Sequence, residues 1–293
     1  MERSAQLIVW VIEFILASPS ESAQSASLEL GALLREWRAL RGKSQIDLSL
    51  DTGVSQRHLS FIESGRSTPS RETLMAIADG LDVPLRDRNV LLLAAGYAPV
   101  YSEQAWDAGE MQGLTRAIER MLRQHDPFPA VVMDRYWNVL MANESAPRFF
   151  NSFIDMSARP EPRNLLHLMF DPQGMRPFVQ GWETLARSLI QRVYRESVGR
   201  VVDARTQHLL AELQKYPGVS PEWRSPAVFN IAPITPVIAY SFVWNQQVLN
   251  YFSMVTTVGS PTAVAAQELR IECMFPTDPE TEALHGEVMS VRA

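Results

Sequence analysis

The sequence has almost no cysteine. Cys273 is the single cysteine among 293 residues, so no intrachain disulfide can form and thiolate-rich zinc modules are excluded. This cysteine usage fits a reducing cytoplasm, where we expect the protein to act. Histidine is also sparse, and the five histidines show no metal-ligand spacing: His58, His125, His167, His208 and His285. The sequence therefore predicts no metal site and no cofactor.

Long apolar runs and a surplus of positive charge are missing as well. The run Leu7–Ala17 contains Glu13 and is much shorter than the ~20 apolar residues of a membrane span. Arg3 alone makes a weak basic region for a signal peptide. We interpret this run as a short helix that packs on another domain or a second subunit, with no membrane partner. The net charge of −6 argues against nucleic-acid binding over the whole surface, but not at one end of the chain.

Motifs of catalysis are absent from the sequence. It has no G-x-S-x-G, no P-loop and no dinucleotide fingerprint. Asp126, Asp134 and Asp171 flank expected turns, where an aspartate caps the turn more often than it acts as an acid or base. We therefore expect that the protein is not an enzyme.

What the sequence does contain is a pair of short helical patterns within Ser44–Arg66. Gly53 separates them, and Ser44 and Ser55 stand where a serine caps a helix start. The apolar residues of the stretch are spaced to share one core: Leu48, Val54, Leu59 and Ile62. The residues then left facing outward are types that read DNA bases: Gln56, Arg57 and Ser60. This arrangement predicts a helix-turn-helix.

Further helices are expected on both sides of this stretch. One helix is expected over Leu28–Arg41, which carries an apolar face. The apolar face is Leu30, Leu33, Leu34, Trp37 and Leu40. A second is capped by Ser70 and ended by Gly80 in the C′ position. A third begins at Pro84 and closes at Gly96. We predict four segments: an N-terminal apolar segment and polar linker (1–27, the linker being Ser18–Ser27), an all-α five-helix DNA-binding domain (28–96), a linker (97–109) and a second domain (110–293).

The second domain reads as α+β. After a helix over Glu110–His125, a hairpin is expected from Ala130–Met133 and Val139–Ala142. Helical patterns follow at 143–151, 164–170, 176–197 and 202–216, and strands at 236–244, 248–258 and 268–275. In the last strand Leu269, Ile271, Cys273 and Phe275 alternate with Glu268, Arg270 and Glu272, which predicts a half-exposed antiparallel strand.

This domain is rich in aromatic residues and methionine, which suits an adaptable apolar cavity. The candidate ligand-binding residues are Phe178, Trp182, Leu185, Tyr240, Phe242, Trp244, Phe252 and Met254. The alternative is that these residues simply fill the core. A ligand carboxylate would need a donor such as Arg176, Arg187, Arg192 or Asn143, and the sequence does not choose among them.

The Ser44–Arg66 stretch resembles the Cro/C1-like helix-turn-helix regulators, also called the xenobiotic-response-element family. The family pattern is matched at Ser44, Gln45, Leu48, Gly53, Val54, Ser55, Leu59, Ser60, Glu63, Gly65 and Arg66. Ser49 departs from it, because alanine usually packs the two helices there. The resemblance implies an ion pair between Arg38 and Glu63. It also implies that the DNA-binding residues are Gln45 (to phosphate), Ser55, Gln56, Arg57, Ser60 and Arg66.

Most of the chain beyond residue 100 is similar to the MmyB-like group of these regulators. The similarity is carried by VVMDRYWNVLMAN (131–143), DPQGMRPFVQGWE (171–183), FSMVTTVGSP (252–261) and ELRIECMFPTD (268–278). It implies a PAS-like ligand-binding domain with an antiparallel sheet and an apolar pocket, whose expected content is a fatty acid. We therefore predict a DNA-binding transcriptional regulator, a repressor, that binds a palindromic double-stranded operator as a homodimer. The alternative is that the second domain serves only dimerisation.

Overall fold

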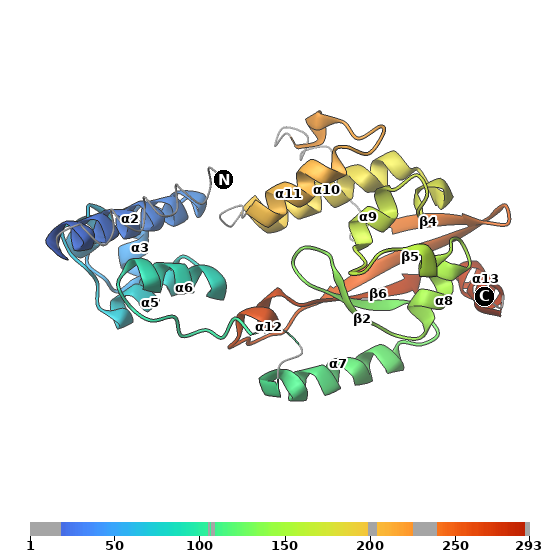
Figure 1. Ribbon diagram of the computed structural model, residues 1–293, viewed down its shortest axis with the longest axis horizontal. Coiled ribbons are helices and arrows are strands. Elements are labelled where there is room, and N and C mark those ends of the chain that lie inside the picture. The colour runs from blue at the N-terminus through green and yellow to red at the C-terminus, as the bar shows by residue number, and fades with distance from the viewer. Residues whose placement is uncertain (1–18, 105, 107–108, 199–203, 225–238, 291–293) are drawn as a thin grey trace, which may run out of the picture. The chain divides into compact units, whose positions relative to one another are not determined.

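The computed structural model describes residues 19–104, 106, 109–198, 204–224 and 239–290 (Figure 1). The chain divides into two compact units, with the division between Ser102 and Glu103. The apolar run Leu7–Ala17 lies outside the described residues.

From residue 19 onward, the first unit is a bundle of five helices, as the sequence predicts. They are α2 (Pro19–Leu40), α3 (Gln45–Thr52), α4 (Gln56–Glu63), α5 (Arg71–Gly80) and α6 (Leu85–Ala94). The core is formed by one apolar stripe from each helix, and its fully buried members include Leu30, Leu34, Trp37, Leu48, Leu59, Ile62, Leu74, Ile77, Leu91 and Leu92. Leu40, which the sequence placed on the buried face, is 40% exposed at the end of α2.

Serine side chains fix the helix starts, as predicted. Ser44 accepts a hydrogen bond from the Asp47 backbone N–H while Asp47 accepts from that of Ser44, a reciprocal capping box. Ser55 and Ser70 cap α4 and α5 without a reciprocal bond: each serine hydroxyl accepts from the backbone N–H three positions later. Between α3 and α4 the chain reverses at Gly53, whose φ of 71° is left-handed and favours glycine.

Three boundary predictions for this unit were wrong. The segment Pro19–Ser27 is the start of α2 rather than a polar linker, because its alanines and glutamate tolerate a helix and proline fits the first turn. Gly80 is the last residue of α5 and not a C′ glycine; a Cβ there would lie 2.4 Å from Thr52 Cγ2, so glycine lets α5 approach α3. Part of the predicted 97–109 linker packs on the unit, since Tyr97 donates to the Pro69 carbonyl and the Tyr101 backbone N–H donates to Asn89.

The second unit contains a six-stranded antiparallel sheet with the order β2-β1-β6-β5-β4-β3. The strands are β1 (Ala130–Met133), β2 (Val139–Ala142), β3 (Val179–Gln180), β4 (Ala239–Trp244), β5 (Gln247–Thr256) and β6 (Arg270–Pro276). The helices are α7 (Gln112–Gln124), α8 (Ser145–Asn151), α9 (Leu165–Phe170), α10 (Trp182–Val198), α11 (Ala204–Leu213), α12 (Val264–Glu268) and α13 (Pro279–Ser290). The predicted hairpin is confirmed with the bounds of both strands.

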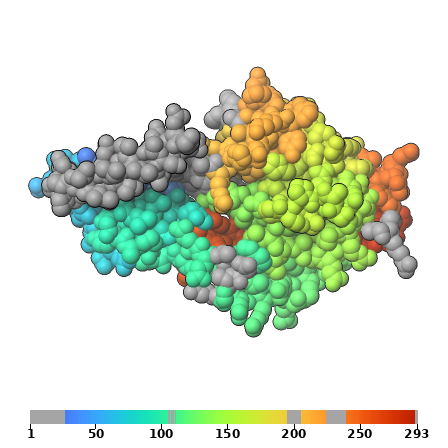
Figure 2. All heavy atoms as spheres, viewed as in Figure 1, coloured from blue at the N-terminus to red at the C-terminus, as the bar shows by residue number. Residues whose placement is uncertain are grey.

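Helices cover both faces of this sheet. On one face α8, α9, α10, α11 and α13 pack over Val131, Met133 and Tyr251 to form the larger core. On the other, α7 and α12 pack over Ala130, Val132 and Ile271. In Figure 2, residues 204–224 (orange) form the top of this unit.

Two predictions for this unit were wrong. Strand β6 is not half-exposed: Arg270 and Glu272 are each only 8% exposed, because the face that carries them packs under the larger set of helices. The helix expected over 176–197 is split into a 3-10 turn (Arg176–Phe178), strand β3 and α10. The break before α10 falls at Gly181, whose φ of 66° is left-handed and favours glycine.

Candidate functional site

The first unit presents the outward face of α4. The side chains of Ser55, Gln56, Arg57 and Arg66 are exposed there, and Ser60 is half-buried beside them. The structure therefore brings the predicted DNA-binding residues of α4 and its flanks to one surface.

Two arginines of this surface are held by one aromatic ring that the sequence analysis did not single out. The Phe61 ring centroid lies 5.4 Å from the Arg57 guanidinium carbon and 4.8 Å from that of Arg66. Arg66 Nε also donates to Ser64 Oγ at 2.8 Å. Cation–π contacts at such distances restrain both guanidinium groups. The i, i+4 spacing of Arg57 and Phe61 is the signal that could have found this contact.

A buried polar network supports α4 from behind. Arg38 Nε lies 2.7 Å from Glu63 Oε1, and Arg38 Nη2 donates to Oε2 at 2.9 Å, so the predicted ion pair is present and bidentate. Gln45 Nε2 donates to the same Oε2 at 2.8 Å. Hydrogen bonding to the carboxylate raises the pKa of Arg38. Since Glu63 is 5% exposed, this network joins α2, α3 and α4 with little water around it.

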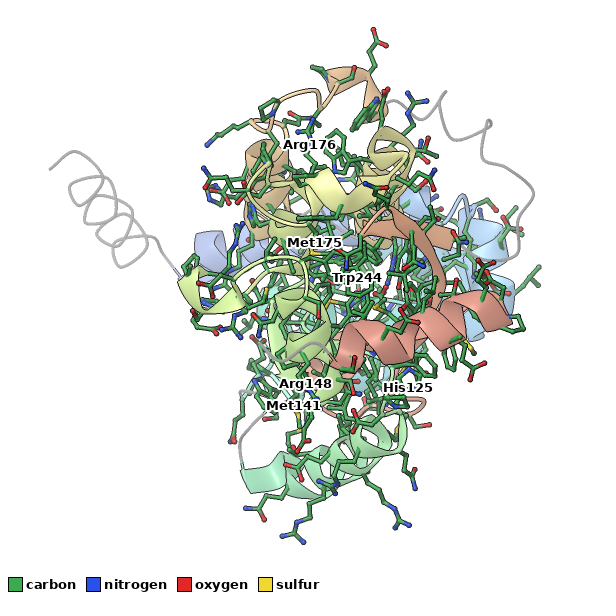
Figure 3. The ribbon with its side chains drawn as sticks, turned by 90° about the vertical axis from the view of Figure 1, so that its right-hand side faces the viewer. His125, Met141, Arg148, Met175, Arg176 and Trp244 are labelled. Atoms are coloured by element: carbon green, nitrogen blue, oxygen red, sulfur yellow. The ribbon has the colours of Figure 1, made fainter. Side chains whose placement is uncertain are left out.

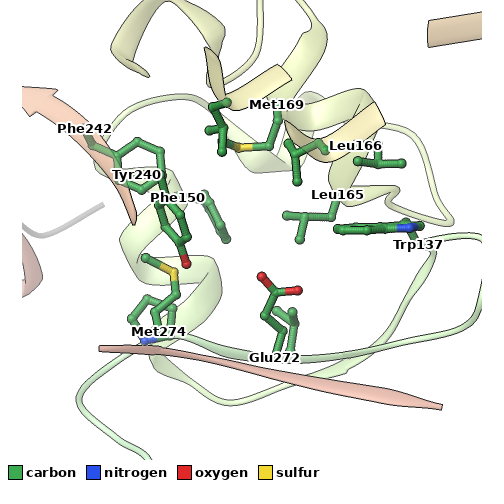
Figure 4. Close-up of a pocket in the computed structure, with 13 residues that line it drawn as sticks. Trp137, Phe150, Leu165, Leu166, Met169, Tyr240, Phe242, Glu272 and Met274 are labelled. Atoms are coloured by element: carbon green, nitrogen blue, oxygen red, sulfur yellow. The ribbon is translucent and has the colours of Figure 1, made fainter. Parts of the chain in front are cut away.

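The second unit contains an inner cavity of about 60 Å³ over the face of the sheet that carries the larger core. Its lining is Pro129, Val131, Trp137, Phe150, Leu165, Leu166, Met169, Leu185, Leu189, Tyr240, Phe242, Glu272 and Met274. Figure 4 shows the Glu272 carboxylate and the Tyr240 hydroxyl pointing into it among apolar side chains. Burial, with a smaller effect from the Glu272 charge, raises the pKa of Tyr240, so this hydroxyl keeps its proton.

Three of the eight predicted ligand-binding residues line this cavity: Leu185, Tyr240 and Phe242. The other five lie outside it. Trp182 donates to the Met169 carbonyl beneath the Arg176 guanidinium, and Phe178 packs on Phe153. Trp244 packs at the edge of the larger core. Phe252 stacks on Phe275 on the opposite face of the sheet, and Met254, on that same face, is 55% exposed.

In the inner cavity, the polar residue Glu272 was missed by the sequence analysis. Strict alternation in β6 placed it toward solvent, whereas the helix α10 covers it and brings Arg192 Nη1 to 3.3 Å from its Oε2. Arg192 also lies over the Trp137 ring, with 4.5 Å between the guanidinium carbon and the centroid. A carboxylate alternating with apolar residues looks the same in a sequence whether its face is bare or covered.

An outer cavity of about 430 Å³ adjoins the inner one. It is lined by Val131, Val139, Ala142, Ala146, Pro147, Phe150, Met156, Arg159, Pro160, Pro162, Arg163, Asn164, Leu165, His167, Leu168, Asp171 and Tyr216. Its volume falls within the ~300–1,000 Å³ of common ligand pockets. Burial alone would raise the pKa of Asp171, but hydrogen bonds from Arg159 and the Gln173 backbone outweigh it and the pKa is lowered.

None of the four donors that the sequence offered for a carboxylate lines either cavity. Arg176 donates to the Pro217 carbonyl and is labelled in the upper part of Figure 3. Arg187 pairs with Glu183, and Arg192 pairs with Glu272. Asn143 accepts from the backbone N–H groups of Ala130 and Ala146 and donates to the Phe128 carbonyl, a structural role. The arginines at a cavity wall are Arg159 and Arg163.

Comparison with known proteins identifies both units. Residues 114–286 match the family model described as the MmyB-like transcription regulator ligand binding domain, and residues 34–87 match a helix-turn-helix model. The chain belongs to the MmyB-like transcription regulators. It combines a helix-turn-helix DNA-binding domain with a ligand-binding domain, as the sequence predicts.

Curated relatives of this MmyB-like regulator match its DNA-binding part. The transcriptional regulator ClgR of Mycobacterium tuberculosis is 37% identical over 89 residues, which cover 29% of this chain and 77% of ClgR. An uncharacterised helix-turn-helix-type transcriptional regulator of the same species is 38% identical over 65 residues. That match covers 22% of this chain, and the chain spans about a quarter of that regulator's length.

Two absences in the described part of this regulator bear on its sites. Among those residues, no group of three or more histidine, cysteine, aspartate or glutamate side chains could hold a metal ion. No helix within the same ranges is both long and apolar enough to cross a membrane.

Proposed function

We propose that this MmyB-like regulator is a ligand-responsive repressor that binds a palindromic operator as a homodimer. One helix-turn-helix reads only a few base pairs, so two half-sites one helical turn apart are needed for a specific site. The observation that supports the DNA contacts is the outward face of α4, where Phe61 holds the guanidinium groups of Arg57 and Arg66. The lone Cys273 supports a reducing cytoplasm as its location.

The ligand we propose is an apolar small molecule, a fatty acid. The adjoining cavities support this choice, because their lining is mainly aliphatic and aromatic with a few polar groups at defined places. A ligand that prefers one arrangement of the protein shifts DNA affinity by its difference in affinity between the two arrangements. No metal or cofactor has a part in this proposal.

The DNA-binding proposal is tested with Arg57→Ala. An operator is first selected from random duplexes with the parent protein, and binding is then measured by fluorescence anisotropy at fixed salt. A bidentate contact to guanine is worth ~1–3 kcal/mol, so we expect about five- to 150-fold weaker operator binding and relaxed sequence preference. Arg120→Ala removes the same charge from an exposed position on α7 in the other unit and serves as the control. Unchanged operator affinity in Arg57→Ala would show that α4 does not enter the groove as proposed.

The ligand proposal is tested by extracting the purified full chain with organic solvent and analysing the extract by mass spectrometry. A stoichiometric apolar molecule supports the repressor as a sensor. A clean extract from protein that still binds its operator as a dimer favours the alternative, in which the second unit serves only dimerisation.

A further inference from the structure

The inner and outer cavities are separated by very little protein. Val131, Phe150 and Leu165 line both of them, so the partition between the two spaces is one side chain thick. Leu165 is half-buried at the start of α9. A change of its staggered rotamer is a small motion compared with any shift of the sheet. A single alkyl chain can therefore extend from the outer cavity into the inner one.

Charge distinguishes the two spaces. In the inner cavity the Glu272 carboxylate is 8% exposed and points into the space beside the Tyr240 hydroxyl (Figure 4). Arg192 approaches this carboxylate from outside the lining. An anionic group placed in the inner cavity would meet a like charge in apolar surroundings, which is unfavourable. The inner cavity thus accepts an apolar end and rejects an acidic one.

The outer cavity has basic side chains in its wall, and they differ in how firmly they are held. Arg159 pairs with Asp171 and donates to the Gln173 carbonyl. His167 contacts Tyr216 and Glu212. Both side chains are therefore already occupied by partners of the protein itself.

Arg163 is held more weakly. Its Nη2 lies 3.0 Å from Glu161 Oε1, but the Glu161 side chain is 64% exposed, and such exposed pairs contribute little. The other contact of Nη2 is a long one, 3.4 Å to the Met156 carbonyl. Arg163 Nε is buried and finds no hydrogen-bond partner among the described residues. A ligand carboxylate at the Arg163 Nη2 group would replace a solvated glutamate.

From this distribution of charge we propose that the cavities bind a single-chain anionic amphiphile with its carboxylate at Arg163 and the end of its alkyl chain in the inner cavity beside Glu272. The inference rests on the proposed function, because it assigns the two ends of the same ligand. It makes Arg163 the anchor of the head group and Glu272 the group that fixes the direction of binding.

Calorimetric titration of the delipidated full chain with dodecanoate and dodecanol tests this orientation, since the two probes share one alkyl chain. We expect Arg163→Gln to weaken dodecanoate binding by about tenfold or more, the usual effect of losing a charge-assisted hydrogen bond, and to change dodecanol binding by less than about twofold. Arg163→Lys keeps the charge and should retain part of the affinity. Arg148→Gln is the matched control, because Arg148 is exposed on α8 and lines neither cavity.

Glu272→Gln separates the possible outcomes. With the head group at Arg163, this change affects dodecanoate and dodecanol equally. If it tightens dodecanoate alone by about tenfold while Arg163→Gln changes neither probe, the carboxylate lies in the inner cavity and the orientation is wrong, although an apolar ligand still binds. If neither probe binds the parent protein, the proposed apolar-ligand function is refuted together with the orientation.

Discussion

The network behind the recognition helix gives a prediction whose size follows from the structure. Glu63→Gln keeps the volume of the side chain but removes the negative charge that Arg38 contacts through two nitrogens. Breaking a buried ion pair from one side costs about 3–5 kcal/mol. The Arg38 side chain is 20% exposed and can regain some water, so we expect the lower end, about 3 kcal/mol of the free energy of unfolding of the first unit. This loss corresponds to a drop of more than about 10 °C in Tm.

Urea denaturation of the full chain measures this loss, and hydrogen exchange of peptides from α2 and α4 assigns it to the first unit. Asp51→Asn is the control. It breaks the Lys43–Asp51 pair, whose side chains are 31% and 47% exposed, and should cost less than about 1 kcal/mol. Replacing both partners of the pair with apolar residues, Arg38→Met with Glu63→Leu, should recover most of the stability. A loss in Glu63→Gln no larger than that in Asp51→Asn would refute the argument that burial gives this pair its strength.

Two further predictions concern stability. Burial, only partly opposed by the Pro127 carbonyl, lowers the pKa of His285, so the unfolded chain binds a proton at its ordinary pKa of ~6.5 before the folded chain does. The free energy of unfolding of the second unit should therefore fall as the pH is lowered from about 7 to 5. In thermal denaturation, His285→Gln should flatten this pH profile. The control His208→Gln, at a side chain 71% exposed, should preserve it. Gly80→Ala should destabilise the first unit by about 1–3 kcal/mol in urea denaturation despite the better helix propensity of alanine, because the new methyl meets Thr52 Cγ2. Adding Thr52→Ser should restore stability, and Gly113→Ala, in a helix with open space, should not destabilise; equal effects at both glycines would contradict the steric explanation.

The sequence predicts best what depends on neighbouring residues. Ser44, Ser55 and Ser70 cap helices because a serine and the N–H three positions later meet in any helix start. The hairpin of β1 and β2 is equally local, since alternation and a short connection determine it. The pair Arg38–Glu63 is not local, and only the resemblance to a known family indicated it.

The ligand site was harder to predict because it depends on which layers cover the sheet. Period-two alternation tells which residues share a face, but not which face is buried. Glu272 was therefore placed in solvent, and Phe252 was grouped with Tyr240 although they lie on opposite faces. Arg163 stands in an irregular segment with no period at all, so nothing in the sequence connected it to a cavity.

The contact of Phe61 with Arg57 and Arg66 has a consequence for the thermodynamics of association. A long arginine side chain loses about 1.5–2 kcal/mol of rotamer entropy when it is immobilised. Here the Phe61 ring of α4 contacts both of these side chains in the free protein, so part of that loss is incurred during folding. The further loss of side-chain entropy on DNA binding is then smaller, because both guanidinium groups are preorganised before the complex forms.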